Sequence, residues 1–425
     1  MIYLGLIIII FIIVMNLLLD KKIFSPVVIF SSLFALILIL ALLRINGIRS
    51  FSDKAIYSIE LGVIFFALGS IIIRLFFESK KDTVNKDLPS ISFDRLNWSF
   101  IKVLALIVTL GTMVTFFYSG KLLLSGGTYT DIRSSLLGYN ESQTLISNGV
   151  LQGLVTYVCG PGLYTLTPIA IFCFVKRSHL SFCLVVFANI ILNSFVTGGR
   201  IFLVYVVLQF LATLTYTNIK FSKRSKALVM GLVLFAIITI FFISNARSER
   251  SIFSVFYAYF SGPVVLLSEW QQVIDSTNTW TYGFSFFYPF TYIINLILNV
   301  LGWSSDFLNN VVNLQGAPQD IWINVFPDMP MNAFVTTFYF FYQDLRFFGI
   351  ILFSMFYGMV CYFVYYKAYV QKNVKYFIMY LLFIKGIVGA FIIWQFGSTS
   401  FFVSFVLLLI CLVEKRKKKK IILSV

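Results

Sequence analysis

Long apolar runs with few charged residues recur along the whole chain. A bilayer core of about 30 Å is crossed by a helix of roughly 20 apolar residues, and eleven runs are long enough or nearly so. They lie at about 2–19, 24–43, 56–77, 100–118, 155–175, 180–196, 200–217, 227–244, 346–366, 375–394 and 399–413. The pattern predicts an all-α, polytopic integral membrane protein with about eleven transmembrane helices.

The composition excludes the other broad classes of protein. Of the 425 residues, 59% are apolar and 12% are charged, whereas about a quarter of the residues in soluble domains are charged. The five cysteines include no CxxC pair, so neither a disulfide framework nor a zinc site is indicated. We therefore expect residues 1–425 to form a single membrane domain. The first run should remain as a span, because no basic segment typical of a signal peptide precedes it.

Basic residues are distributed unevenly between the two predicted sides of the membrane. With the N-terminus outside, twenty-two lysines and arginines face the cytoplasm and nine face outward, which is the asymmetry that the positive-inside rule requires. The basic tail at 414–425 is then cytoplasmic. The net charge of +16 therefore indicates contact with the lipid bilayer, and we expect no binding to nucleic acid.

Most connections between the predicted spans are short, but two segments on the predicted outer side are longer. The smaller one covers 119–148, and a large one of roughly 100 residues covers 245–345. Within the large loop, 252–268 and 283–302 are apolar and aromatic enough to raise the count to thirteen spans, but Gly and Pro interrupt both. We favour interfacial or re-entrant helices there. Long loops usually carry function.

Arginines on the outer side oppose the charge bias. Arg200 follows Gly198 and Gly199 at the start of a predicted helix, where free N–H groups and a close backbone approach favour an anion such as phosphate. Arg247 and Arg250 follow the next span, and three guanidinium groups together would clamp a diphosphate. The alternatives are a plain turn with Arg200 reaching lipid headgroups, and a solvated surface for the other two.

Other polar residues offer weaker signals. Asn332, Tyr342, Asp344 and Arg346 lie among aromatic residues, as in a sugar-binding cleft, or else form a helix cap with an interfacial anchor. Lys385 lies within a predicted span, where an ammonium group costs several kcal/mol; it is either part of an internal ion pair or on a substrate path. The chain has no DxD pair, P-loop or HExxH motif, so we expect no bound metal and no cofactor.

Several segments together resemble the O-antigen polymerase (Wzy-type) oligosaccharide repeat unit polymerases. They are TGGR at 197–200, NARSER at 245–250, YFSGP at 259–263, YGFSFFYP at 282–289 and the stretch 332–349. The resemblance implies a GT-C-like glycosyltransferase of the bacterial plasma membrane. It would join oligosaccharide repeat units carried on undecaprenyl diphosphate, as donor and acceptor, at the outer face. It also implies a separate chain-length regulator as partner.

The resemblance and the charges give an expected mechanism and three rivals. Arginines would stabilise the diphosphate leaving group, and Asp344 or Glu249 would orient or deprotonate the acceptor hydroxyl. An O-antigen ligase would have the same arrangement of spans and outer loop. A resemblance to that family would imply a histidine in an outer loop, whereas His179, the one histidine of the sequence, is predicted on the cytoplasmic side. A flippase or transporter would need discontinuous helices or internal symmetry. The third rival is a structural subunit of a polysaccharide export complex, but this role would not explain the arginines on the outer side.

Overall fold

The computed structural model describes most of the chain. The described residues are 2–20, 22–79, 96–128, 148–197, 199–217 and 252–413, with 131, 132, 135, 145 and 146 between them. The predicted span at 227–244 lies outside these residues, as does the tail at 414–425.

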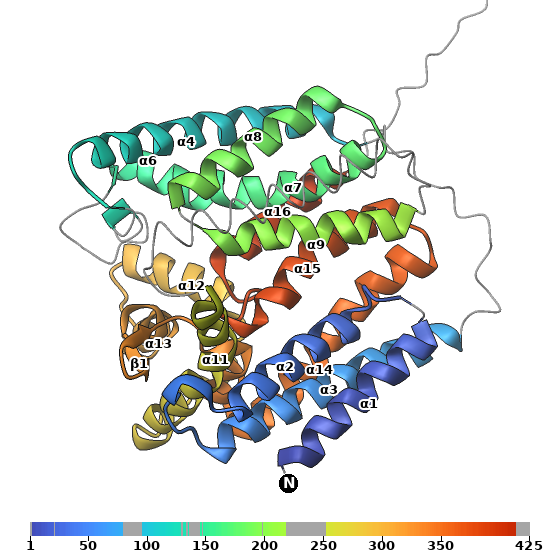
Figure 1. Cartoon of the computed structure of the whole chain (residues 1–425). Coiled ribbons are helices and arrows are strands. Elements are labelled where there is room, and N and C mark those ends of the chain that lie inside the picture. The colour runs from blue at the N-terminus through green and yellow to red at the C-terminus, as the bar shows by residue number, and fades with distance from the viewer. Residues whose placement is uncertain are drawn as a thin grey trace, which may run out of the picture.

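Helices dominate the described residues and lie side by side in a bundle (Figure 1). They are α1 (Ile2–Asp20), α2 (Pro26–Leu42), α3 (Asp53–Glu78), α4 (Trp98–Leu124), α6 (Gly149–Leu154), α7 (Gly160–Val175), α8 (Leu180–Thr197), α9 (Arg200–Thr217), α11 (Ile252–Ser276), α12 (Tyr288–Val300), α13 (Asp306–Asp320), α14 (Thr336–Tyr365), α15 (Val374–Val388) and α16 (Thr399–Leu412). A π-helical turn, Val155–Cys159, joins α6 to α7. Two short strands, β1 (Ile323–Phe326) and β2 (Met329–Met331), form an antiparallel pair that the all-α prediction did not include.

The long apolar helices confirm a membrane protein. Seven helices within the described residues are long and apolar enough to cross a bilayer, and four shorter apolar helices accompany them. Every predicted span that falls within the described residues coincides with a helix. Helix α4 continues to Leu124, so the first residues of the predicted loop at 119–148 are helical.

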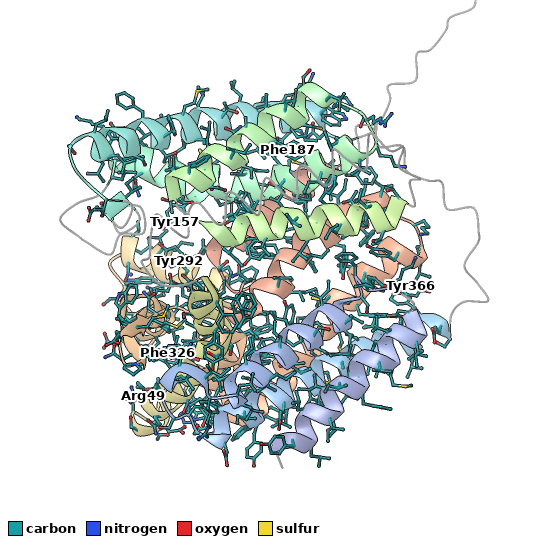
Figure 2. All side chains as sticks on the ribbon, in the orientation of Figure 1. Arg49, Tyr157, Phe187, Tyr292, Phe326 and Tyr366 are labelled. Carbon is teal, nitrogen blue, oxygen red and sulfur yellow. The ribbon has the colours of Figure 1, made fainter. Side chains whose placement is uncertain are left out.

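The ends predicted to be cytoplasmic gather at one end of the bundle. The backbone N–H of Asn97 donates to the carbonyl of Cys411 (3.1 Å), and the Tyr380 hydroxyl donates to the carbonyl of Phe24 (2.6 Å). Tyr366 marks this end in Figure 2. These contacts agree with the predicted alternation of the helices, and which end faces the cytoplasm stays a prediction.

The segments predicted to be outside gather at the opposite end. Arg49 pairs with Glu269 (3.1 Å), and the hydroxyls of Tyr157 and Tyr292 are 3.4 Å apart. Figure 2 shows Arg49, Tyr157, Tyr292 and Phe326 at the end away from Tyr366, where α11, α12 and α13 also lie. We call this end of the bundle the loop end.

Helix α14 is a hairpin of two limbs. The backbone breaks at Leu345 and Arg346, where φ of Arg346 is +57°. A Cβ placed on Gly349 would lie 2.1 Å from the carbonyl oxygen of Phe341, although residues eight apart in a straight helix are separated by about 12 Å. The rings of Phe341 and Phe353 are also 5.8 Å apart. The first limb, 336–344, therefore runs antiparallel to the second, 347–365.

The first limb of α14 lies inside the bundle. All nine of its residues are buried, and the Phe338 ring packs against Phe34 at 4.9 Å and against Gly62 of α3. The sequence prediction placed 336–344 in the outer loop and began the span at 346. The second limb begins where the span was predicted to begin, but the buried helical limb before it was not predicted. The apolar rings of 336–344 fill the space between α2, α3 and the second limb.

The segment 252–268 was predicted to form an interfacial or re-entrant helix, and the buried position of α11 does not fit an exposed interfacial helix. Four consecutive residues, Val264–Leu267, are completely buried, so neighbours cover every face of the helix at this level. Helix α12, in contrast, exposes an apolar face that includes Phe290, Ile294 and Ile297. This exposed face is typical of a helix at a membrane interface.

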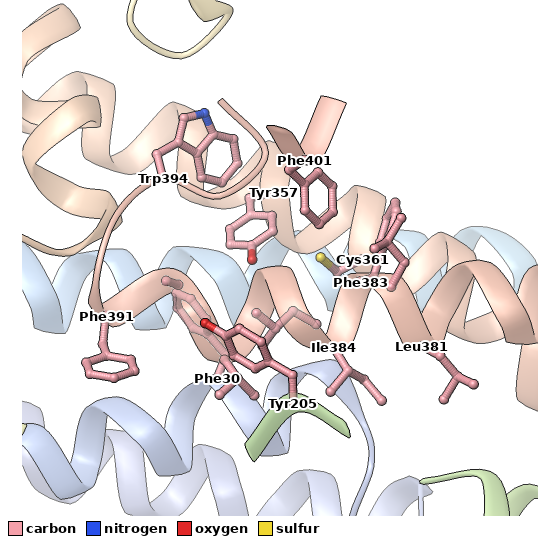
Figure 3. Packing of buried hydrophobic residues seen from close by; sticks show 14 of the residues in the cluster. Phe30, Tyr205, Tyr357, Cys361, Leu381, Phe383, Ile384, Phe391, Trp394 and Phe401 are labelled. Carbon is pink, nitrogen blue, oxygen red and sulfur yellow. The ribbon is translucent and has the colours of Figure 1, made fainter. Parts of the chain in front are cut away.

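Aromatic side chains fill the centre of the bundle. Phe30 and Phe66 stack at 4.1 Å, and Tyr357 meets Trp394 edge to face at 4.9 Å. Figure 3 shows Tyr357, Trp394 and Phe401 in this core. Such edge-to-face pairs add roughly 0.5–1.5 kcal/mol each beyond burial of their area.

Candidate functional site

The predicted diphosphate site is described only in part. Helix α9 begins at Arg200, and the N–H of Gly199 donates to the Thr197 hydroxyl at 3.2 Å. Gly198, the Arg200 side chain and the segment carrying Arg247, Glu249 and Arg250 lie outside the described residues. The helix start that was predicted to bind an anion is therefore present. The cluster of three arginines stays a prediction.

Lys385 lies in the last turn of α15 and is 95% buried, with 5% of its surface exposed. Its Nζ lies 3.7 Å from the ring centroid of Tyr164 and 5.5 Å from that of Phe401. It forms no ion pair within the part of the chain that the structure describes. Aromatic faces and the carbonyl end of α15 stabilise the ammonium partly, but neither supplies a full negative charge.

Helix α9 places its first turn near Lys385. The Gln209 side chain donates to the carbonyl of Leu381 at 2.8 Å, which fixes α9 along α15. Nearer the start of α9, the Phe202 ring meets Tyr164 edge to face at 4.9 Å, and Tyr164 is the ring that covers Lys385. The structure therefore brings Lys385 and the Gly199–Arg200 turn to the same part of the bundle, although they are 185 residues apart.

Asp344 holds a turn of the backbone. Its carboxylate accepts hydrogen bonds from the Thr281 hydroxyl (2.5 Å), the N–H of Ser285 (3.0 Å) and the N–H of Phe286 (2.8 Å). The side chain is 0% exposed. These bonds use most of the acceptor capacity of the carboxylate, so the geometry favours a positioning role over proton transfer to a substrate.

Tyr342 and Arg346 join a charged cluster at the loop end, which we call the Asp275 cluster. Asp275 accepts a hydrogen bond from the Tyr342 hydroxyl (2.7 Å), pairs with Lys54 and lies 3.5 Å from the Nε of Arg346. The Arg346 guanidinium also stacks on Trp280 at 4.6 Å. The cluster ties α3, α11 and α14 together at the break in α14.

Asp275 remains ionised within this cluster. Burial raises its pKa, but hydrogen bonds from Lys54 and Tyr342, with the charges of Lys54 and Arg346, outweigh burial and hold the pKa below its usual value. Two cations face one carboxylate, so the cluster carries a net positive charge. Lys54 and Asp275 were not predicted from the sequence, because each is only a polar residue near a helix end.

Asn332 lies at the end of β2 and contributes to local structure. Its side-chain amide donates to the carbonyl of Gln319, and the next N–H, of Ala333, donates to the carbonyl of Pro318 at 2.6 Å. These bonds fix the strand pair against the end of α13. A glycan-binding role for Asn332 stays a prediction.

No family model, no curated protein and no solved structure matches this chain.

Proposed function

We propose that this protein polymerises lipid-linked oligosaccharides at the outer face of a bacterial plasma membrane. The observation that carries the proposal is Lys385, an ammonium buried in a membrane protein without a carboxylate partner among the described residues. A buried ion of this kind supports a place on a substrate path, and an anionic ligand would supply the negative charge that the described residues do not. A diphosphate on a lipid carrier meets this requirement, because its lipid lies in the bilayer and its charge lies near the surface.

The proposed reaction is a glycosyl transfer between two lipid-linked saccharides. The acceptor hydroxyl forms a bond to the anomeric carbon of the donor, the bond from that carbon to the diphosphate oxygen breaks, and the lipid diphosphate leaves with the electron pair. Lys385 and the first turn of α9, with Arg200, would stabilise the charge that develops on the leaving group. The acceptor proton passes to a carboxylate, for which Glu249 is the proposed candidate, because the Asp344 carboxylate is buried and accepts hydrogen bonds from Thr281, Ser285 and Phe286.

Reconstitution with a single purified lipid-linked repeat unit tests this proposal. Proteoliposomes that contain the protein should convert the repeat unit into a ladder of longer products and release undecaprenyl diphosphate. Vesicles with the Lys385→Met variant should leave the repeat unit unchanged. A wild-type protein that is folded, bound to the repeat unit and unable to extend it would contradict the proposal.

A transporter of lipid-linked saccharides is the second candidate, and the break in α14 favours it. Interrupted helices with buried short limbs are common in secondary transporters, and the limb at 336–344 is buried in this way. A deletion strain separates the two functions. Unextended units on the outer leaflet indicate a missing polymerase, whereas units trapped on the inner leaflet indicate a missing transporter.

A further inference from the structure

Tyr282 has a strained backbone and an exposed ring. Its φ is +50°, a conformation that is rare for bulky L-residues. Its neighbour Gly283 has φ of +95°, which glycine adopts without cost. Yet 64% of the Tyr282 surface is exposed, so burial of the ring does not explain why a tyrosine occupies a position better suited to glycine.

The broken end of α14 imposes this strain. The N–H groups of Thr281 and Tyr282 donate to the carbonyls of Gln343 and Asp344, each at 3.3 Å, and these carbonyls are free because the helix stops there. The Asp344 carboxylate fixes the following residues through the N–H groups of Ser285 and Phe286. Strain that the surroundings enforce in this way is typical of functional sites.

The ring of Tyr282 extends the Asp275 cluster outward. It lies nearly parallel to Trp280, with centroids 6.3 Å apart and planes at 20°, and 6.5 Å from Phe307. Arg346 covers the Trp280 ring at 4.6 Å and approaches Asp275. An exposed aromatic face therefore adjoins a carboxylate and two cations, each of which is only partly buried.

We propose that Tyr282 and the Asp275 cluster form a subsite that binds the saccharide chain, away from the diphosphate site at Lys385. The negative face of an aromatic ring attracts the weakly positive C–H groups of a sugar ring. The Asp275 carboxylate accepts hydrogen bonds from sugar hydroxyls, and Lys54 and Arg346 donate to sugar oxygens. This subsite rests on the proposed function, which supplies the saccharide, and it gives Asp344 the role of a positioning residue.

Three variants of Tyr282 test the subsite, with binding of the delipidated polysaccharide of the producing strain as the readout. Tyr282→Gly removes the ring and the backbone strain together, so its melting temperature in detergent should equal or exceed that of the wild type, while binding weakens at least tenfold. Tyr282→Trp and Tyr282→Phe keep a ring and should bind within threefold of the wild type. Trp322→Ala removes another exposed ring at the loop end (61% exposed) and should change neither quantity.

The outcomes separate this inference from the proposed function. Lys385→Met should bind the delipidated polysaccharide normally while failing to extend lipid-linked units, and loss of binding in this variant would overturn the division into two sites. Wild-type protein that does not bind the polysaccharide, or a Tyr282→Gly variant that binds as the wild type does, overturns the subsite. A Tyr282→Gly variant that melts below the wild type also overturns it, because the ring would then serve packing.

Discussion

Arg74 and Lys385 both lie within predicted spans, and their surroundings differ. Arg74, at the end of the bundle opposite the loop end, pairs with Asp20 (3.1 Å) and with Glu78 (3.0 Å). Lys385 has aromatic rings around it and no carboxylate among the described residues. Because an ionised group in a membrane requires compensation, the fold alone explains Arg74, whereas for Lys385 we propose a ligand that brings the negative charge.

The largest expected effect is on Lys385. Lys385→Met should reduce polymer yield at least tenfold, because the leaving diphosphate loses its buried cation. Folding should be unchanged or improved, since the variant removes an unpaired charge from the interior. Polymer is measured as chain-length distribution on gels, and stability as the melting temperature in detergent. Lys367→Met, which removes a lysine at the end of the bundle opposite the loop end, is the control. A Lys385→Met strain with normal polymer chains would contradict the proposed difference between Lys385 and Arg74.

Arg74 should respond in the opposite way. Arg74→Met leaves the carboxylate of Asp20 buried without its cation, and removal of one partner of a buried pair costs about 3 kcal/mol. We expect less folded protein in the membrane and normal chain lengths from whatever protein remains. Adding Asp20→Asn should restore part of the stability. A polymer defect larger than the loss of protein would show that Arg74 also meets substrate.

Asp344 should have an intermediate effect through Tyr282. Asp344→Asn replaces one acceptor oxygen by a donor that faces the backbone N–H of Ser285 or Phe286, and an unsatisfied buried group costs about 1–3 kcal/mol. We expect a lower melting temperature together with weaker saccharide binding. If Asp344 were instead the base, Asp344→Asn would retain saccharide binding and lose turnover, so a titration of the variant with polysaccharide decides between the two roles.

The smallest expected effect is the pH dependence that Asp275 contributes. Its folded-state pKa lies below the ordinary value, so its stabilising contribution is fully present above the unfolded pKa of about 3.9. That contribution is lost as the pH falls toward and through the lowered folded pKa. The melting temperature should therefore decrease in acid below about pH 4. Asp275→Asn should weaken this acid dependence, and an unchanged acid dependence would remove Asp275 as its source.

The sequence predicts the parts of the fold that depend on hydropathy alone. Runs of apolar residues located the helices, and their alternating direction agrees with the contacts at the two ends of the bundle. The predicted span begins at the break at Leu345 and Arg346, but the hairpin that α14 forms there was not predictable, because neither residue is Gly or Pro. It depends instead on hydrogen bonds from Thr281 and Tyr282, more than sixty residues earlier.

The candidate site, like the fold, was predictable from the sequence only in part. Lys385 was identifiable because a charge within an apolar run is visible in the sequence itself. Asp275 and Lys54 were not, since each is an ordinary polar residue at a helix end, and only packing of α3 against α11 brings them together. Strain at Tyr282 likewise has no sequence signal apart from the neighbouring Gly283.

Binding of undecaprenyl diphosphate itself tests the central claim most directly. Native mass spectrometry of the purified protein, titrated with this lipid, should give a wild-type affinity at least tenfold higher than that of Lys385→Met. Lys367→Met should bind as the wild type does. Equal affinity of the wild type and Lys385→Met would show that the buried ammonium does not hold the diphosphate, and would contradict the account.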